Sequence, residues 1–256
     1  MSLHVEIIGQ GADIVLLHGW GMHGGVWAAV AAELAHERRV HVVDLPGMGY
    51  SDPVAPCDLA HLADSVAEII PKNSTVIGWS LGGQIALKIA LDHPQKTSRL
   101  ILVDSTPRFV QAHDWQAGVA PEVFREFAAQ VGDDYRETMT RFLGLQTFGG
   151  ASSRIALRDL KERFFTRPAP SPAVLRDALD ILLTTDLREQ LPRLQQPALL
   201  IHGSRDTLVP PDASRWMAAQ LPRARLKIID GASHAPFLSH PAVFMQTLNE
   251  FFGENN

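Results

Sequence analysis

The chain has 256 residues, of which 46% are apolar and 20% are charged, and its formal net charge is −5. This length and apolar content are enough for one sizeable hydrophobic core. The acidic balance argues against a general nucleic-acid binder, and the single cysteine, Cys57, excludes an intramolecular disulfide. No segment has the ~18–20 apolar residues needed to span a bilayer, and the first residues do not resemble a secretory signal. We therefore expect a cytoplasmic protein that binds neither nucleic acid nor membranes, and we expect a monomer.

Short apolar runs that are typical of buried strands alternate with helical patterns in the first 107 residues. We expect strands at 5–8, 14–17, 40–43, 75–77 and 99–103, and helices at 27–36, 59–70 and 81–92. The first two strands are separated by Gly-Gln-Gly-Ala-Asp, residues 9–13, a combination that favours a β-hairpin.

The pattern changes after residue 107. From 108 to about 188 the β-branched runs disappear, and amphipathic stretches rich in Phe, Leu and Arg replace them. Strands return at 198–201 and 226–229, and a helix follows at 241–252. Strand–helix alternation interrupted by a helical block predicts a mostly parallel α/β sheet with an inserted cap. We place the core at 1–107 and 189–256 and the helical cap at 108–188, as an insertion in a single catalytic domain.

A candidate nucleophile, Ser80, lies between the strand at 75–77 and the helix that follows. The sequence Gly78-Trp-Ser-Leu-Gly82 fits G-x-S-x-G in the strand–turn–helix context that this motif requires. The turn is so tight that residues two positions either side of the serine must lack a side chain. The alternative is a chance match in which Ser80 only caps a helix.

A serine hydroxyl needs a base to take its proton and an acid to orient that base. His234 follows the strand at 226–229, and Asp206 follows the strand at 198–201, so both share the carboxyl edge of the sheet with Ser80. The chain order Ser, Asp, His is that of α/β hydrolases. His18 is the second choice of base, although a structural hydrogen-bonding role suits it better, and Asp104 is the second choice of acid.

Glycines after the strand at 14–17, in His18-Gly-Trp-Gly21, let the backbone approach a ligand closely. The backbone N–H groups of Trp20 and Leu81 are candidate oxyanion donors. The alternative is a plain turn in which Trp20 only fills the core.

Neither a dinucleotide cofactor nor a metal is expected. The Gly47-x-Gly49 pair lacks the third glycine of G-x-G-x-x-G, since Asp52 stands there, and Pro53 follows. The histidine spacings do not form His-Glu-x-x-His, and one cysteine cannot provide a cysteine pair for zinc.

The chain resembles the α/β-hydrolase superfamily along essentially its whole length. Within it, Leu-His-Gly-Trp-Gly-Met at 17–22, Gly-Trp-Ser-Leu-Gly-Gly at 78–83, Arg-Phe-Leu-Gly-Leu-Gln at 141–146 and Asp-Ile-Leu-Leu-Thr-Thr-Asp-Leu-Arg at 180–188 resemble the pimeloyl-[acyl-carrier protein] methyl ester esterases of biotin synthesis. The resemblance implies a serine carboxylesterase with Ser80, Asp206 and His234 as its triad and an acyl-carrier protein as partner. It also implies that the substrate contacts Trp20, Ser80, Leu81, His234 and a cap run consisting of Phe142, Leu143, Gly144, Leu145 and Gln146.

A basic cap face is the candidate docking site for the acidic carrier. Between 136 and 167 the chain has seven basic and three acidic side chains. The predicted docking residues are Arg136, Arg141, Arg154 and Arg158. Arg154, Arg158 and Lys161 fall on one face of a helix, and such a face steers an acidic partner. The alternative is a solvated face with internal pairs such as Arg158–Glu162.

Two other functions stay open. One is a general short-chain carboxylesterase without a carrier partner, and the other is a hydrolase-fold protein that binds a ligand without turnover.

Overall fold

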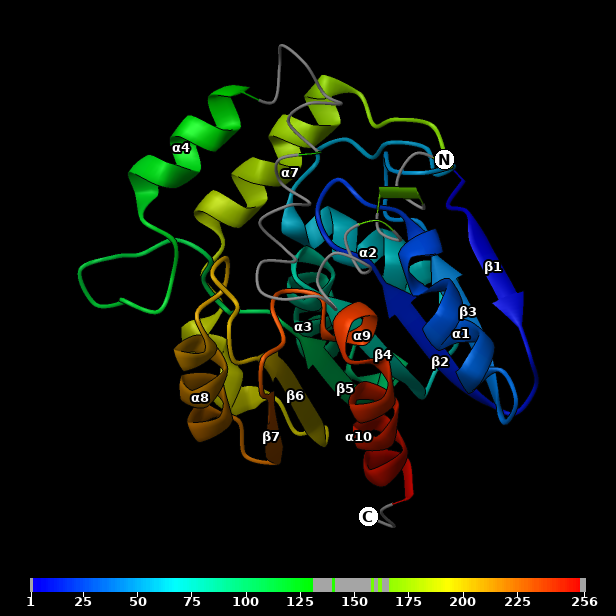
Figure 1. Cartoon of the computed structure of the whole chain (residues 1–256). Coiled ribbons are helices and arrows are strands. Elements are labelled where there is room, and N and C mark those ends of the chain that lie inside the picture. The colour runs from blue at the N-terminus through cyan, green and yellow to red at the C-terminus, as the bar shows by residue number, and fades with distance from the viewer. Residues whose placement is uncertain (1, 131–139, 141–157, 159–160, 163–165, 254–256) are drawn as a thin grey trace.

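Within the residues described by the computed structural model, seven strands form one sheet in the order β1-β3-β2-β4-β5-β6-β7 (Figure 1). The strands are β1 (Val5–Ile8), β2 (Ala12–Leu17), β3 (Arg38–Val43), β4 (Ser74–Trp79), β5 (Thr97–Val103), β6 (Ala198–Gly203) and β7 (Ala224–Ile229). β1 is antiparallel to β3, and all other neighbours are parallel. The structure describes the whole chain except residues 1, 131–139, 141–157, 159–160, 163–165 and 254–256. The α/β-hydrolase fold predicted from the sequence is confirmed.

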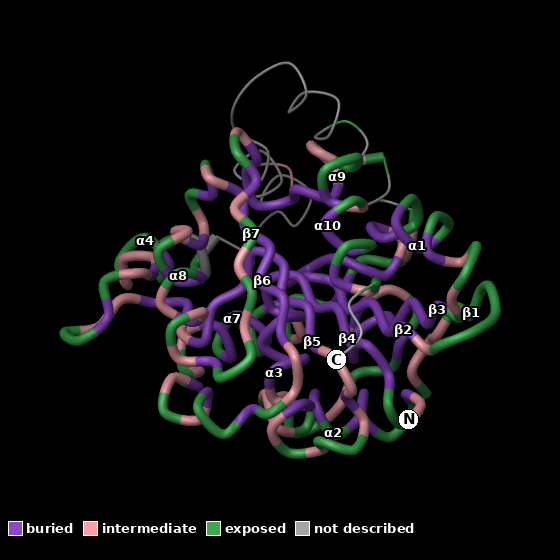
Figure 2. The backbone as a smooth tube through the Cα atoms, turned by 90° about the horizontal axis from the view of Figure 1, so that it is seen from below, coloured by how far each residue is buried: buried purple, intermediate pink, exposed green. Residues whose placement is uncertain are grey.

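Burial follows the position of each strand in the sheet. Every residue of the central β4 is buried, because helices cover both faces of a parallel sheet. The edge strands differ: exposed and intermediate residues occupy all of β1, and the residues of β7 alternate between intermediate and exposed along most of its length. Figure 2 shows the buried strands running through the middle of the molecule. The core therefore lies around β2, β4, β5 and β6, and their carboxyl ends form a rigid edge for a functional site.

The predicted hairpin between β1 and β2 is wrong. Both strands exist, but β3 lies between them and pairs with each: Val5 faces Val43 in the antiparallel pair, and Leu17 faces Val43 in the parallel pair. The glycines of the connection serve another purpose. Gly9 and Gly11 have φ angles of 74° and 115°, and a Cβ atom on Gly9 would lie 2.2 Å from the carbonyl oxygen of Arg38. They let the connection cross close to the start of β3.

Helices cover both faces of the sheet. The α-helices are α1 (Ala28–Leu34), α2 (Leu59–Ile69), α3 (Leu81–Asp92), α4 (Pro121–Gln130), α7 (Pro172–Thr184), α8 (Pro211–Gln220), α9 (Pro236–Ser239) and α10 (Pro241–Gly253). The 3-10 helices are η1 (Gly24–Trp27), η2 (Pro94–Lys96) and η3 (Arg188–Arg193). α1 and α10 lie on one face and α2 and α3 on the other (Figures 1 and 2), while α8 packs on β6 and β7. Sequence periodicity found most of these helices but missed α8 and α9.

The segment between β5 and β6 contributes α4 and α7, which lie beyond the carboxyl ends of the parallel strands (Figure 1). The indole Nε1 of Trp20 donates to the carbonyl oxygen of Leu175 in α7 at 3.0 Å, so this helix is bonded directly to the loop after β2. Much of the segment lies outside the described residues, and the predicted cap boundaries of 108 and 188 stay a prediction. In the described part of the chain, no helix has both the length and the apolar character needed to cross a membrane.

A buried ion pair ties the residues before α7 to the core. Nη1 of Arg167 lies 2.6 Å from both carboxylate oxygens of Asp44, which follows β3, and Nη2 contacts Glu6 in β1. The Asp44 side chain is fully buried and also accepts hydrogen bonds from the N–H groups of Gly24 and Tyr50. Burial alone would raise the pKa of Asp44, but the neighbouring His18, these two N–H donors and the Arg167 guanidinium hold it below its usual value.

We expect Arg167→Met to lower the free energy of unfolding by about 3 kcal/mol, because it leaves a buried carboxylate without its cation. The control is Arg215→Met, which removes an exposed arginine that pairs with Asp212 at 2.9 Å and should change stability by less than about 1 kcal/mol. Urea denaturation followed by tryptophan fluorescence measures both. Equal losses in the two variants would show that the Arg167 pair has no special role.

Candidate active site

Ser80 occupies a sharp turn between β4 and α3. Its φ of 55° and ψ of −118° are rare for a residue with a side chain. The turn is held at both ends, because the Ser80 N–H donates to the carbonyl oxygen of Val103 at 3.0 Å and Ser105 Oγ donates to the carbonyl oxygen of Ser80 at 2.9 Å. The hydroxyl-bearing residue is therefore fixed at the carboxyl edge of the sheet.

The glycines around Ser80 are required by close contacts. A Cβ atom on Gly78 would lie 2.2 Å from the carbonyl oxygen of Gly82, and one on Gly82 would lie 2.5 Å from the carbonyl oxygens of Leu17 and His18. Real Cβ atoms do not approach this closely, so β2, β4 and α3 meet only because both positions lack a side chain. The sequence analysis expected both glycines for the same reason, namely that the turn around Ser80 is too tight for side chains at these positions.

Asp206 and His234 lie together at the same edge. His234 Nδ1 and Asp206 Oδ2 are 2.7 Å apart, and both side chains are buried. The second carboxylate oxygen of Asp206 accepts from the N–H groups of Leu208 and Val209 at 2.9 and 3.0 Å. The loop backbone thus fixes one oxygen and leaves the other to orient the imidazole.

Trp79 fastens the His234 loop beside the serine. Its indole Nε1 donates to the carbonyl oxygen of His234 at 2.6 Å, and the two rings are 5.7 Å apart. Trp79 immediately precedes Ser80, so this bond brings the imidazole to the turn. His234 Nε2 is buried and has no hydrogen-bond partner among the described residues, so it makes no hydrogen bond to Ser80 Oγ. A buried ring nitrogen without a partner is available to accept a proton, and catalytic hydrogen bonds often tighten only when substrate is bound.

Two further titratable groups border this pair. His202 Nε2 is 3.3 Å from Asp206 Oδ2 and 3.6 Å from Asp104 Oδ1. Burial would raise the pKa of Asp206, but His234 and His202 hold it well below its usual value. Burial raises the pKa of Asp104 to about 7.

In the described chain, the potential ligand atoms of Asp104, Asp206 and His234 lie within 4.8 Å of one another, close enough to suit a metal. The Asp206–His234 hydrogen bond accounts for the proximity of two of these residues.

The alternative base and acid have other partners. His18 Nδ1 bonds the carbonyl oxygen of Gly19 at 2.8 Å, and its Nε2 accepts from the N–H of Leu45 at 2.9 Å. Burial lowers the pKa of His18 to about 4, so the ring is neutral at pH 7. Asp104 accepts from the N–H of Gly203 at 2.8 Å and does not bond His234. The structural role favoured for His18 therefore agrees with the structure.

The oxyanion candidates lie on either side of Ser80. Leu81 is the first residue of α3, so its N–H has no acceptor within that helix, and the positive end of the helix dipole lies there. Trp20 is almost fully buried in the loop after β2, whose Gly19 packs against the Ser80 side chain. Their role as oxyanion donors stays a prediction.

Most predicted cap residues lie outside the described part of the chain. These are Phe142, Leu143, Gly144, Leu145, Gln146, Arg136, Arg141 and Arg154. Arg158 is described: it is exposed, and its Nε lies 3.8 Å from Glu162 Oε1. This is the internal pair that the solvated-face alternative anticipated.

Sequence reasoning missed two residues that shape the site, His202 and Trp79. His202 lies four residues before Asp206, which was a usable signal because it is also at the end of a strand. The bond from Trp79 to His234 joins residues 155 apart, and nothing in the local sequence indicates it.

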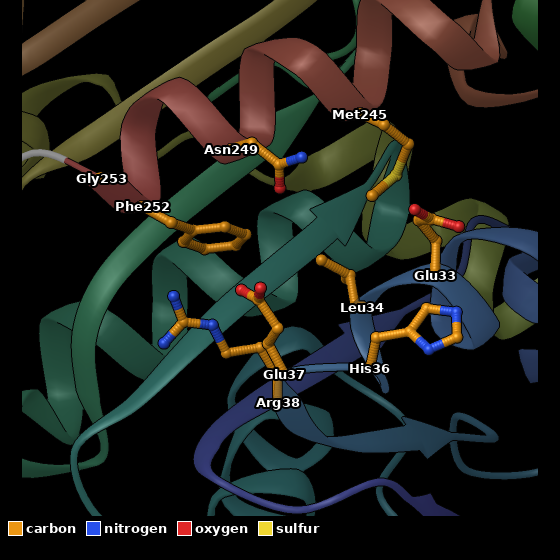
Figure 3. A pocket seen from close by; sticks show the side chains of 9 residues that line it. All are labelled: Glu33, Leu34, His36, Glu37, Arg38, Met245, Asn249, Phe252 and Gly253. Atoms are coloured by element: carbon orange, nitrogen blue, oxygen red, sulfur yellow. The ribbon is translucent and has the colours of Figure 1, made fainter.

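A surface hollow of about 390 Å³ lies at the opposite edge of the sheet. Residues of α1, the start of β3 and α10 line it, among them Glu33, His36, Arg38 and Phe252 (Figure 3). The amino ends of the parallel strands meet there, far from Ser80, so this hollow is separate from the site.

Comparisons with known proteins agree with this geometry. The family model described as alpha/beta hydrolase fold matches residues 14–241. The chain is 40% identical to the pimeloyl-[acyl-carrier protein] methyl ester esterase of Nitrosospira multiformis, over 98% of both chains. It is 43% identical to the protein of the same name from Nitrosomonas europaea, over 95% of this chain and 97% of that one. Among solved structures, an esterase from Exiguobacterium antarcticum aligns with a TM-score of 0.90 at 25% identity, over 98% of this chain and 96% of that one.

We expect Gly82→Ala to lower the free energy of unfolding by about 1–3 kcal/mol, because the added methyl group meets backbone atoms that cannot move separately. Thermal or urea unfolding measures the change. Gly253→Ala is the control, since a Cβ atom there has nothing within 4 Å, and its stability should change by no more than about 0.5 kcal/mol. A Gly82→Ala protein as stable as the parent would contradict the close-packed turn.

Proposed function

Since the chain belongs to the alpha/beta hydrolase fold family, and within it to the family of pimeloyl-[acyl-carrier protein] methyl ester esterases, we propose that it hydrolyses that methyl ester in biotin synthesis. The products are pimeloyl-[acyl-carrier protein] and methanol. The observation that carries the hydrolytic chemistry is the Asp206–His234 hydrogen bond beside the Ser80 turn. The near full-length match to esterases of this name supports the substrate.

The reaction proceeds in two halves. His234 Nε2 takes the proton of Ser80 Oγ as that oxygen attacks the ester carbonyl carbon. Asp206 holds the imidazole in orientation and stabilises the imidazolium that forms. His234 then gives the proton to the departing methoxide, which leaves as methanol. Water attacks the acyl-enzyme with the same base, and Ser80 regains its proton as the pimeloyl carboxylate leaves on its carrier.

Two backbone N–H groups stabilise the negative oxygen of each tetrahedral intermediate. The proposed donors are Trp20 and Leu81, each contributing roughly 3–4 kcal/mol to the transition state. The helix dipole of α3 acts in the same direction. Phe142 and Leu145 are the proposed apolar contacts of the acyl chain together with Trp20, as the resemblance to these esterases implies.

The carrier protein docks on the basic cap face that includes Arg141, Arg154 and Arg158. Acyl-carrier substrates are acidic, so this face raises the rate of encounter and fixes the orientation of the acyl arm. The Arg158–Glu162 pair favours the second candidate function, a general short-chain carboxylesterase without a carrier, because it neutralises part of that face. A protein that binds a ligand without turnover is the third candidate.

We expect Ser80→Ala to abolish hydrolysis and Asp206→Asn to lower kcat by about 10⁴-fold, because the first removes the nucleophile and the second weakens the orientation of His234. A chromogenic aryl ester measures both. The parent should also react with a fluorophosphonate label, and Ser80→Ala should not. If the parent neither labels nor turns over ester, the ligand-binding candidate replaces the enzyme.

We expect simultaneous charge reversal of Arg141, Arg154 and Arg158 to Glu to lower kcat/KM for the carrier-linked methyl ester by about tenfold or more at low salt. The aryl ester should be hydrolysed as before, since it needs no docking. The matched control reverses three exposed arginines elsewhere, Arg193, Arg215 and Arg223, and makes the same change in net charge. Equal effects of the two triple variants on the carrier substrate would contradict the docking face and favour the esterase without a carrier.

A further inference from the structure

Two buried titratable residues that the proposed mechanism does not use, Asp104 and His202, lie next to Asp206. His202 lies in β6 with no exposed surface, and both of its ring nitrogens are engaged. Nδ1 lies 2.6 Å from Ser214 Oγ in α8, and Nε2 donates to the carbonyl oxygen of Val209 at 2.8 Å. The ring is therefore fixed by partners at both nitrogens.

His202 Nε2 also faces two carboxylates. It lies 3.3 Å from Asp206 Oδ2 and 3.6 Å from Asp104 Oδ1. The backbone N–H of Gly203 holds Asp104 Oδ1 in place, whereas Asp104 Oδ2 is buried with no hydrogen-bond partner in the described structure. Asp104 also has a φ of 43°, a conformation that non-glycine residues rarely adopt. A strained, fully buried residue with an unpartnered polar atom points to a functional constraint.

Asp104 and His202 both act on the pair used in the mechanism. Asp206 Oδ2, which faces His202, is the same atom that accepts the hydrogen bond from His234 Nδ1. Asp104, Asp206 and His234 offer polar atoms within 4.8 Å of one another. A charge on Asp104 or His202 therefore interacts with this hydrogen bond across the buried protein interior, where solvent and salt screen charges only weakly.

The charges of this cluster can be assigned at neutral pH. Burial works against a charge on His202, yet Asp104 and Asp206 raise its pKa to about 9, so the ring is a cation. Burial raises the pKa of Asp104 to about 7, so Asp104 is partly ionised. Among the residues that the structure describes, the titratable groups of this cluster are Asp104 after β5, His202 near the end of β6, Asp206 after β6 and His234 after β7. α8 contributes the neutral hydroxyl of Ser214.

We propose that Asp104 and His202 are positioning residues of the ester hydrolysis proposed above, and that together they set the electrostatic field at the Asp206–His234 hydrogen bond. The inference rests on the proposed function for its catalytic meaning. The negative charge of Asp104 favours the imidazolium that His234 becomes during the reaction, and the positive charge of His202 opposes it. His202 also allows two carboxylates to stay buried side by side.

The first test is Asp104→Asn, which keeps the size of the side chain and an oxygen for the N–H of Gly203. Without the negative charge, the His234 imidazolium forms less readily. The acid limb of the kcat/KM profile should therefore move to lower pH by about 1 unit. The pH dependence of hydrolysis of a small aryl ester measures this shift, because it does not depend on a carrier protein.

The second test is His202→Gln, alone and combined with Asp104→Asn. In the D104N background, removal of the His202 cation should move the acid limb back toward higher pH by about 1 unit. In the parent background the same change should give a smaller shift, because Asp104 then takes up a proton and compensates for the lost cation. This dependence on background is specific to a coupled charge pair.

A matched control is His41→Gln. His41 is also a buried histidine bonded to a carboxylate, Asp13, at 2.7 Å, but it lies in the middle of β3 on the far side of β2 from β4. The acid limb of the kcat/KM profile of His41→Gln should stay at the pH of the parent. Removal of one member of a buried pair destabilises the protein, so thermal unfolding is measured together with each pH profile. The double variant should be more stable than His202→Gln alone, because folding no longer requires Asp104 to be buried without its cation or to take up a proton.

A second readout does not need turnover. In histidine-labelled protein, NMR follows the pH at which the His234 ring signal changes, and the signal is assigned by its absence in His234→Ala. The expected result is the same direction of shift in Asp104→Asn and its reversal in the double variant. Unchanged midpoints and acid limbs would overturn the inference and leave Asp104 a purely structural residue. Shifted NMR midpoints in a protein that hydrolyses no ester would uphold the charge pair and reject the proposed function.

Discussion

The backbone conformation of Ser80 is the constraint on which the site depends. A φ of 55° for a residue with a side chain costs about 1–3 kcal/mol, and it persists only where the surroundings enforce it. Here Val103 at the end of β5 supplies a carbonyl acceptor, and Ser105 in the loop after β5 supplies a hydroxyl donor. Gly78 and Gly82 let β2, β4 and α3 meet. The buried sheet therefore holds the nucleophile in a position that a free loop could not maintain.

Local signals in the sequence were sufficient for the parallel part of the fold. Apolar runs marked the ends of the strands to within two residues, because a strand buried on both faces has no need of polar alternation. The G-x-S-x-G pattern indicated the turn, since its glycines follow from contacts made within a few residues. The rule that carboxyl ends of parallel strands share an edge then brought Asp206 and His234 together.

Features that depend on distant contacts could not be predicted in this way. Turn residues between β1 and β2 suggested a hairpin, but the sheet places β3 between them, a choice made by the packing of the whole sheet and not by the turn. The bond from Arg167 to Asp44 spans 123 residues, and that from Trp79 to His234 spans 155. A lone arginine or tryptophan in a sequence carries no signal of such a partner.

The choice between Asp104 and Asp206 shows what the structure adds. Each follows a strand, the two strands are neighbours, and both residues fit the chain order Ser, Asp, His, so the sequence left Asp104 open as the second choice. Their loops separate them physically: two N–H groups fix one oxygen of Asp206 and direct the other to His234, whereas Asp104 is held by the N–H of Gly203. Two carboxylates that lie this close together and are buried away from water would repel each other, and one of them would be protonated. His202 Nε2 lies 3.3 Å from Asp206 and 3.6 Å from Asp104, so a protonated His202 relieves part of that repulsion, and the two carboxylates in turn raise its pKa.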